Sequence, residues 1–255
     1  MEQPLISILL CTYNGAAFLE EQIQSIINQT YPNLEIIISD DASTDATKTI
    51  IEKYSRHSKI IIQLNNQNVG LQKNIELAAR LSKGSYIGFS DQDDYWLPDK
   101  IEKLYMAIDG HSLVYSDSKL VNEKGNDLNR NLSDFRNLQN IYHSKGFGIY
   151  NAVSGHTMLA SREVVEYALP IPAGYYHDWW IAVQAANLNG IQFLNEKLFY
   201  NKFYNLYLLK NKGHFAWPLF WFLIRNQHNI FKFSKKNKLS QLTEIRKRAR
   251  GEKEI

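Results

Sequence analysis

The chain has 255 residues, of which 44% are hydrophobic and 22% charged, and its formal net charge is +3. These values are ordinary for a soluble globular protein and exclude a disordered or fibrous chain, and the length allows a full hydrophobic core. Cys11 is the only cysteine, which excludes an internal disulfide and indicates a reducing compartment. No stretch reaches 18 uncharged apolar residues, so no single membrane-spanning helix is expected.

The charge is unevenly distributed along the chain. Residues 200–255 contain 13 Lys and Arg against three Glu, whereas the preceding part is acidic. We therefore predict a domain over residues 1–200 and an aromatic, basic extension over residues 201–255. A basic tail on an acidic body indicates contact with an anionic surface.

Apolar runs of strand length alternate with segments of helical spacing in the first part of the chain. Strands are predicted over residues 5–11, 34–39, 59–64 and 86–90, and helices over residues 16–29, 46–54 and from the turn at 65–70 to Leu81. This alternation of continuously apolar strands with helices is typical of a parallel sheet covered on both faces. The predicted fold class is therefore α/β, with a mostly parallel central sheet flanked by helices.

The pattern is less regular after Pro98. A Pro-started helix follows that residue, and we predict strands over residues 112–116, 152–160 and 191–200 and a helix over residues 176–189. Residues 127–148 are polar, and we expect a mobile excursion near the site there.

A polar cluster follows each of the first four predicted strands. These clusters are Thr12-Tyr13-Asn14, Asp40-Asp41, residues 65–70 and residues 91–94. Parallel strands end at one edge of an α/β sheet, and that edge is where ligands bind. The four clusters together therefore predict one binding site.

Three carboxylates lie within the four residues Asp91-Gln92-Asp93-Asp94. Asp91 and Asp93 point to the same side of an extended segment, where they can share a divalent cation with the phosphates of a substrate. A solvated acidic turn is the alternative for any isolated cluster of this kind, but the neighbouring polar clusters favour the cation site.

Three motifs in this order resemble family-2 glycosyltransferases: residues 7–15, residues 39–45 and the acidic cluster. Longer strings are similar to a bacterial rhamnosyltransferase-like branch of that family: Asn68-Val69-Gly70 with Asn74, residues 90–100 and residues 177–180. The resemblance covers about residues 4–200. It implies a metal-dependent enzyme that inverts the sugar configuration and has the A-type nucleotide-diphospho-sugar transferase (GT-A) fold.

The resemblance implies a donor site for a pyrimidine nucleotide-diphosphate sugar, either dTDP-rhamnose or a UDP-sugar. Asp41 would accept a hydrogen bond from the base N–H, which suits an acceptor-only carboxylate, and Thr12 and Tyr13 would hold and stack the base. For Asp40, a cap on the following loop is favoured. The expected donor-binding residues are Thr12, Tyr13, Asn14, Asp41, Asn68, Gly70, Asn74 and Asp91.

The resemblance also implies roles in catalysis. Asp93 and Asp91 would hold Mn²⁺ or Mg²⁺ against the diphosphate, where the cation stabilises the leaving group, and Asp94 would bind the metal or orient the loop. Asp178 is the expected catalytic base for the acceptor hydroxyl, with a helix cap as its alternative. His177 would bind phosphate, ligate the metal or cap the helix.

Trp179, Trp180 and His156 are the expected acceptor-binding residues. For Trp180 a core position is at least as well supported, and for His156 a hydrogen-bonded structural role is favoured. The implied acceptor is a glycan or lipid-linked molecule in bacterial surface polysaccharide synthesis, and the implied location is cytoplasmic.

Residues 200–204 depart from the family, because they lack the Arg and His with which relatives often contact the diphosphate. Lys202 offers charge without a bidentate fork. This departure supports one alternative, a non-catalytic sugar-nucleotide or glycan-binding module. The other, a sugar nucleotidyltransferase, needs a Gly-rich loop with Arg and Lys, which residues 12–15 do not provide.

The aromatic segment 215–224 is followed by clustered lysines, which fits either a peripheral contact with the inner face of the cell membrane or a helix docked on the domain. No nucleic-acid partner is expected, because no recognition motif accompanies the basic residues 246–250.

Overall fold

The computed structural model describes residues 3–122, 125–143 and 152–202, and a mixed β-sheet is its central element. The strands are β1 (Ile6–Thr12), β2 (Leu34–Asp40), β3 (Ile60–Leu64), β4 (Tyr86–Ser90), β5 (Tyr95–Trp96), β6 (Leu113–Val121), β7 (Asp127–Asn131), β8 (Met158–Ser161) and β9 (Ile191–Lys202). The helices are α1 (Leu19–Ile27), α2 (Thr47–Glu52), α3 (Leu71–Leu81), α4 (Lys100–Ile108), α5 (Arg162–Ala168) and α6 (His177–Asn187), with short 3₁₀ turns η1 (Leu132–Asp134) and η3 (Gly155–Thr157).

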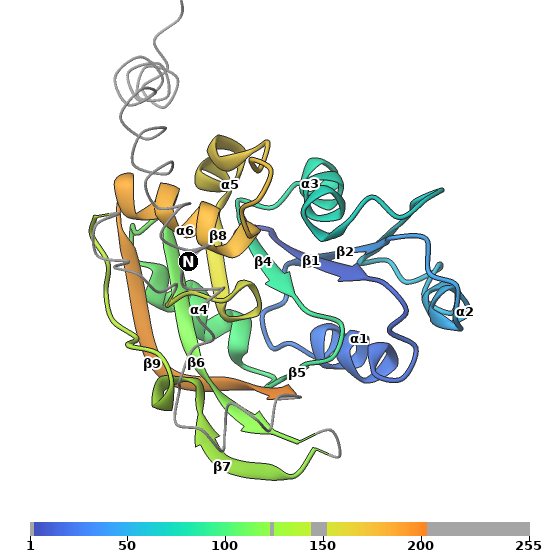
Figure 1. The fold of residues 1–255 in the computed structure, drawn as a ribbon, viewed down its shortest axis with the longest axis horizontal. Coiled ribbons are helices and arrows are strands. Elements are labelled where there is room, and N and C mark those ends of the chain that lie inside the picture. Colours follow the sequence, from blue (N-terminus) through green and yellow to red (C-terminus); the bar gives the residue numbers. More distant parts are fainter. Residues whose placement is uncertain (1–2, 123–124, 144–151, 203–255) are drawn as a thin grey trace, which may run out of the picture. The chain divides into compact units, whose positions relative to one another are not determined.

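The sheet has a parallel half and a mixed half (Figure 1). Its strand order is β3-β2-β1-β4-β8-β6-β9-β5, with β7 paired to β6. The first four strands in this order are parallel, as the alternating strand and helix pattern predicts. β8 is antiparallel to both of its neighbours, and β9 is parallel to β6. The predicted α/β fold class, with a parallel sheet region flanked by helices, is confirmed.

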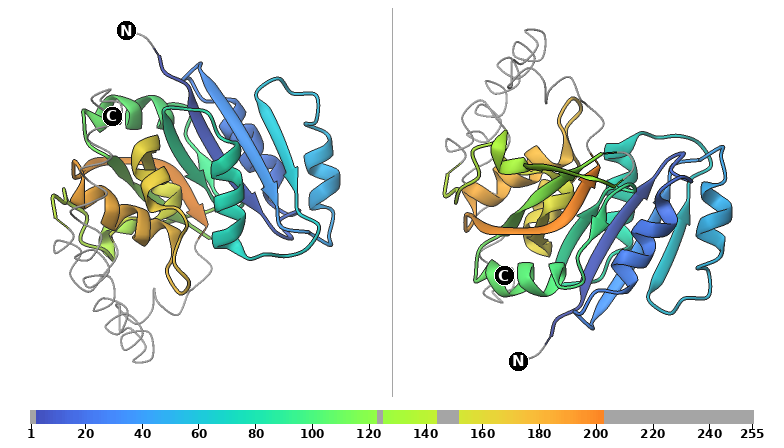
Figure 2. Two further views of the ribbon diagram at one scale, coloured as in Figure 1. Left: turned by 90° about the horizontal axis from the view of Figure 1, so that it is seen from above. Right: turned by 90° about the horizontal axis from the view of Figure 1, so that it is seen from below.

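Helices cover both faces of the sheet (Figure 2). Alternate residues of β1 point to opposite sides, so Ile6, Ile8 and Leu10 pack in a buried cluster with residues of α1, α2 and α4. The opposite face is covered by α3, α5 and α6. Burial on both faces explains why β1 and β2 are continuously apolar.

The second half of the chain differs from the sequence prediction in three places. Residues 127–134 form β7 and η1, where we expected a mobile excursion. β7 is polar because it is a mostly exposed strand that pairs with β6 at the margin of the sheet. The strand predicted over residues 152–160 begins only at Met158, after η3. α5 was not predicted, although Ser161 caps it by accepting a hydrogen bond from the N–H of Val164.

The closing strand β9 continues to Lys202, past the predicted domain boundary at residue 200. The division into 1–200 and 201–255 stays a prediction, and the predicted membrane-contacting tail lies outside the described residues. Within residues 3–122, 125–143 and 152–202, no helix combines the length and the apolar character that crossing a bilayer requires.

Candidate donor-binding and catalytic site

A pocket of about 420 Å³ opens at the carboxyl edge of β1, β2 and β4, where the polar clusters were expected to meet. Most of the predicted donor and metal residues line it: Thr12, Tyr13, Asp41, Asn68, Gly70, Asn74, Asp91 and Asp93. The other predicted site residues, none of which lines this pocket, are Asn14, His156, Asp178, Trp179 and Trp180.

Asp41 holds the turn at one end of the pocket. Its carboxylate accepts hydrogen bonds from the N–H groups of Val69 (2.8 Å) and Gly70 (2.9 Å) and from the Asn65 side chain (3.1 Å). Gly70 has a φ of +84°, a conformation that glycine adopts without strain. Each carboxylate oxygen has two lone pairs, so Oδ2, which accepts one of these bonds, keeps acceptor capacity for a base N–H.

Asn74 supports the same end from α3 and is buried. Its Nδ2 donates to the backbone oxygen of Ser39 (2.7 Å), and its Oδ1 accepts from the Ser39 hydroxyl (2.6 Å) and from Asn65 (3.0 Å). These bonds connect Asp41, Asn65 and Asn74 in one network, so Asn74 positions this wall of the pocket.

The loop after β1 is fixed by residues next to the pocket. Asp40 accepts hydrogen bonds from the Ser43 N–H and the Thr12 hydroxyl, both at 2.9 Å, which fits the capping role favoured for it. Asn14 accepts a hydrogen bond from the Thr44 N–H (2.8 Å). Tyr13 is 47% exposed, so its ring is available for stacking on a base.

Gln92 joins this loop to the acidic one, a contact that the sequence did not reveal. Its Oε1 accepts from the Tyr13 N–H (2.9 Å), and its Nε2 donates to the Tyr13 oxygen (3.1 Å). A side chain at Gly15 would overlap the Gln92 amide and so displace it from this contact. Gln92 therefore holds the loop after β1 and the acidic loop after β4 together.

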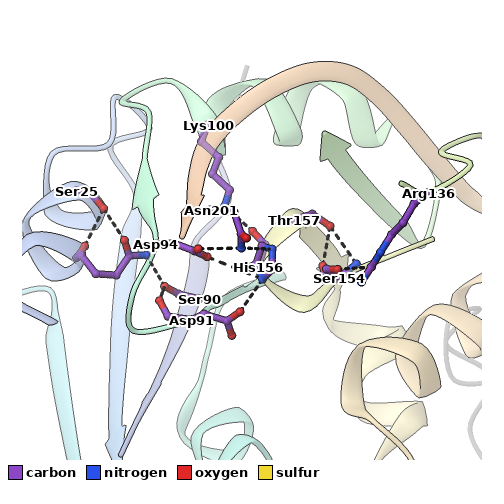
Figure 3. Close-up of polar contacts among 11 residues, drawn as sticks. Ser25, Ser90, Asp91, Asp94, Lys100, Arg136, Ser154, His156, Thr157 and Asn201 are labelled. Carbon is purple, nitrogen blue, oxygen red and sulfur yellow. Dashed lines mark hydrogen bonds and ion pairs between the residues drawn. The ribbon is translucent and has the colours of Figure 1, made fainter. Parts of the chain in front are cut away.

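Asp91, Asp94 and His156 form a group at the other end of the pocket (Figure 3). One ligand atom from each lies within 4.8 Å of the others, as in a metal site. His156 Nδ1 contacts Asp91 Oδ2 at 2.6 Å, and Asn201 donates to Asp94 Oδ1 (3.2 Å) and lies 3.1 Å from His156 Nε2. Within the described residues, Asp94 Oδ2 is buried without a hydrogen-bond partner.

This donor set fits a divalent cation, because two carboxylates and an imidazole suit Mn²⁺ and the unpartnered Asp94 oxygen supplies a ligand atom. Since His156 already binds Asp91, a cation between these two residues would have to replace that contact. Asp93, the other predicted ligand, lines the pocket beside them.

The group has strongly perturbed protonation equilibria. Burial raises the pKa of Asp94 to about 7. Burial also raises the pKa of Asp91, but the charge and hydrogen bond of His156 outweigh it, so the net pKa is lowered. For His156, burial lowers the pKa, and the charges of Asp94 and Asp91 raise it above its usual value. Because the pKa of Asp94 lies near neutral pH, binding of a cation would shift this carboxyl to its ionised form.

Lys100 is a buried lysine that contacts this group. Its Nζ donates to the backbone oxygen of His156 (2.6 Å) and lies 3.6 Å from the ring centroid of Trp96 and 4.2 Å from that of Phe199. Burial lowers the pKa of Lys100 well below its usual range, against the raising effect of Asp94. Lys100 therefore holds the His156 backbone by a hydrogen bond, while the rings of Trp96 and Phe199 hold the Lys100 amino group in place.

Asp178 lies in the first turn of α6 and is partly exposed. Its Oδ1 accepts from the neighbouring Trp179 N–H at 2.6 Å, but the N-cap position of α6 belongs to Tyr176, so this contact is not the helix cap considered as its alternative. Burial lowers the pKa of the Arg136 guanidinium, and the nearby charge of Asp178 raises it by a smaller amount. Arg136 also donates a hydrogen bond to the Ser154 hydroxyl (2.5 Å) (Figure 3).

Both tryptophans of α6 are buried, with exposed fractions of 4% for Trp179 and 6% for Trp180. Trp180 Nε1 donates to the oxygen of Ala168 (2.7 Å), which fits its alternative core position. Neither indole offers an open face for a sugar, so their acceptor roles, like that of His156, stay predictions.

Sequence reasoning missed Gln92, Lys100 and Asn201 as site residues. Gln92 lies inside the acidic motif, and Lys100 begins a helix in which its side chain is fully buried, but neither feature has a sequence signal of its own. Asn201 belongs to the segment that lacks the expected Arg and His. It contacts the site through Asp94 and His156 instead.

A doubly covered sheet with a polar pocket and carboxylates at its carboxyl edge defines an α/β protein that binds its ligand at the ends of the strands. A family model described as "Glycosyl transferase family 2" matches residues 7–169, so the chain belongs to this family. It is 38% identical over 120 residues to the Escherichia coli protein named UDP-Glc:alpha-D-GlcNAc-diphosphoundecaprenol beta-1,3-glucosyltransferase WfaP, covering 47% of each chain.

A second relative is the putative teichuronic acid biosynthesis glycosyltransferase TuaG of Bacillus subtilis, with 34% identity over 102 residues and 40% of each chain covered. The chain thus spans less than half the length of these curated relatives. The fold is similar to that of S. aureus TarS 1-349 in complex with UDP-GlcNAc, with a TM-score of 0.64 and 23% identity over 79% of this chain and 59% of TarS 1-349. It is also similar to the mannosyltransferase PcManGT from Pyrobaculum calidifontis in complex with GDP-Man and Mn²⁺, with a TM-score of 0.61 and 20% identity over 79% and 57% of the two chains.

Proposed function

We propose that this protein is an inverting glycosyltransferase that moves a sugar from a pyrimidine nucleotide-diphosphate donor to a glycan or lipid-linked acceptor. The observation that supports this most is that Thr12, Asp41 and Asp93 line one pocket, with Asp178 nearby on α6. This pocket has an acceptor carboxylate for a base at one end and an acidic group for a metal and diphosphate at the other.

In the proposed reaction, Asp178 takes the proton of the acceptor hydroxyl as its oxygen attacks the anomeric carbon. The bond between that carbon and the phosphate oxygen breaks, and the nucleoside diphosphate leaves on the opposite face. Asp91 and Asp93, with Asp94 and His156 beside them, would hold Mn²⁺ or Mg²⁺. When bound, this cation acts as a Lewis acid for the charge that develops on the leaving group.

The relatives favour a UDP-linked donor, because the name of WfaP contains UDP-Glc and the TarS structure is a complex with UDP-GlcNAc. Neither name supports the rhamnosyltransferase-like branch, so dTDP-rhamnose is our second candidate. The names of WfaP and TuaG support a lipid-linked or cell-wall glycan acceptor, and hence a role in bacterial surface polysaccharide synthesis at the inner face of the membrane.

Thermal-shift measurements with UDP, dTDP and GDP, each with and without Mn²⁺, test this proposal. We expect UDP or dTDP to stabilise the protein more in the presence of Mn²⁺. Asp93→Ala should remove this metal dependence, whereas Asp127→Ala, at a partly exposed carboxylate of β7, should keep it. The proposal is wrong if no pyrimidine nucleotide stabilises the protein under any of these conditions.

A non-catalytic binding module is the alternative, and it predicts the same thermal shifts. Incubation with UDP-glucose and Mn²⁺ separates the two. Release of UDP, by hydrolysis or by transfer to an added lipid-diphosphate acceptor, supports the enzyme, and nucleotide binding without any release of UDP supports the module.

A further inference from the structure

His177 is a pocket residue to which neither the family resemblance nor the proposed reaction gives one definite role. It begins α6, is 8% exposed and lines the same pocket as Asp91 and Asp93. Its Nδ1 is buried and has no hydrogen-bond partner in the described part of the chain. A buried polar atom without a partner lowers stability, so its presence in a binding pocket points to a function.

The imidazole of His177 has little freedom to move. Its ring centroid lies 5.7 Å from that of Phe89, at an interplanar angle of 36°. On the other side, a Cβ atom at Gly155 would lie 2.5 Å from Nε2. Residue 155 must therefore be a glycine for the ring to keep this position, and η3 and α6 pack together at this point.

The chemistry of the ring suits a hydrogen-bond donor. Burial lowers the pKa of His177, and it does so in spite of the nearby charges of Asp178 and Asp91. At neutral pH the imidazole is therefore uncharged and has one N–H and one acceptor nitrogen. It leaves the negative charge of the pocket unchanged and offers its N–H to an oxygen atom.

The sheet topology shows which part of a donor would lie next to His177. Asp41 follows β2, Asp91 follows β4, and Gly155 directly precedes β8, in the strand order β2-β1-β4-β8. If the base lies against Asp41, as in the proposed function, the diphosphate lies near Asp91 and the sugar end near Gly155 and His177.

We propose that His177 is a donor-binding residue, whose imidazole N–H donates a hydrogen bond to an oxygen at the sugar–diphosphate end of the nucleotide sugar. This inference rests on the proposed function, because it uses the same pocket. Gly155 acts as a positioning residue, since it leaves room for the ring.

Calorimetric titrations with UMP, UDP and UDP-GlcNAc in Mn²⁺-containing buffer test this inference. For His177→Phe, which keeps the packing against Phe89 but loses the N–H, we expect affinity for UDP-GlcNAc to fall about tenfold or more. Affinity for UMP should stay unchanged. An equal loss for UDP assigns the hydrogen bond to the diphosphate, whereas a loss confined to UDP-GlcNAc assigns it to the sugar.

Two further variants separate donor binding from a structural role. His177→Gln retains an N–H donor and should keep most of the affinity, whereas Gly155→Ala should weaken binding as His177→Phe does, because the new methyl group displaces the ring. His111→Phe, at a histidine outside the pocket, is the matched control and should bind all three nucleotides normally.

The inference is overturned if His177→Phe binds all three nucleotides as the wild type does, or if His177→Gln is as weak as His177→Phe. Failure of the proposed function looks different, since the wild type itself would then bind neither UDP nor UDP-GlcNAc.

Discussion

The two ends of the pocket differ in how completely their polar groups are paired. At the Asp41 end, Asp41, Asn65 and Asn74 bond to one another, to backbone groups and to Ser39. At the acidic end, Asp94 Oδ2 and His177 Nδ1 are buried and have no hydrogen-bond partner among the residues that the structure describes.

This difference indicates two kinds of site. The Asp41 end is preorganised, so we expect it to bind its ligand without rearrangement and its residues also to contribute to stability. The acidic end has charges and ligand atoms that a cation and a diphosphate would pair. We therefore expect substitutions at the first end to affect folding and nucleotide binding together, and substitutions at the second to affect mainly metal binding and turnover.

The largest expected effect is that of Asp178→Asn. Asparagine keeps the size of the side chain but cannot take a proton, so kcat for sugar transfer should fall about 10²–10⁴-fold. Affinity for UDP, measured by calorimetry, should remain that of the wild type. Transfer at the normal rate would remove Asp178 from the base role.

Asp41→Ala should lower the free energy of unfolding by about 3 kcal/mol, because the N–H groups of Val69 and Gly70 lose a charged acceptor. UDP affinity should fall in the same variant. Urea denaturation measures the first effect and calorimetry the second, with Asp127→Ala as the exposed control. An unchanged free energy of unfolding would contradict the stabilising role that we assign to Asp41.

Lys100→Met tests the role of the buried Lys100 side chain next to the acidic end. Methionine fills similar space but cannot donate to the His156 oxygen, and we expect the free energy of unfolding to fall by about 2 kcal/mol. Lys103→Met on the same helix removes two exposed ion pairs, with Asp99 and with Glu196, so its effect in urea denaturation should stay below about 1 kcal/mol. Equal effects of the two substitutions would show that Lys100 has no special role.

Cys11 lines the pocket, and its thiol senses the charges of Asp41 at one end and Asp91 at the other. Burial, together with the charges of Asp91 and Asp41, raises the pKa of the thiol. Because the thiolate is the reactive form, alkylation by iodoacetamide at pH 8 should be about tenfold slower than in urea-unfolded protein. UDP with Mn²⁺ should slow it further, since Cys11 lines the pocket. A native rate equal to the unfolded one would contradict the assigned environment.

The sequence predicted the first half of the fold well because that half is regular. Its strands β1, β2 and β4 are buried on both faces, and a polar cluster follows each strand, so the sequence pattern places Thr12, Asp41 and Asp91 at one edge. The irregular half was harder, since β7 is polar and exposed, and the two-residue β5 is held by pairing with β9. Nothing local in the sequence marks either strand.

Within the site, the acidic motif identified the carboxylates but not their neighbours. His156 and Asn201 meet Asp91 and Asp94 only through long-range packing, at sequence separations of 65 and 107 residues. The pairing of Gly155 with His177 likewise depends on how η3 approaches α6. Such contacts are set by the tertiary fold, so a single sequence does not reveal them.

The double hydrogen bond between Gln92 and the Tyr13 backbone imitates one more rung of the sheet, placed beyond the ends of the strands. It ties the loop after β1 to the acidic motif, so these two parts of the pocket cannot separate independently. For the donor that we propose, this tie would set the span between a base stacked on Tyr13 and a diphosphate at the acidic motif.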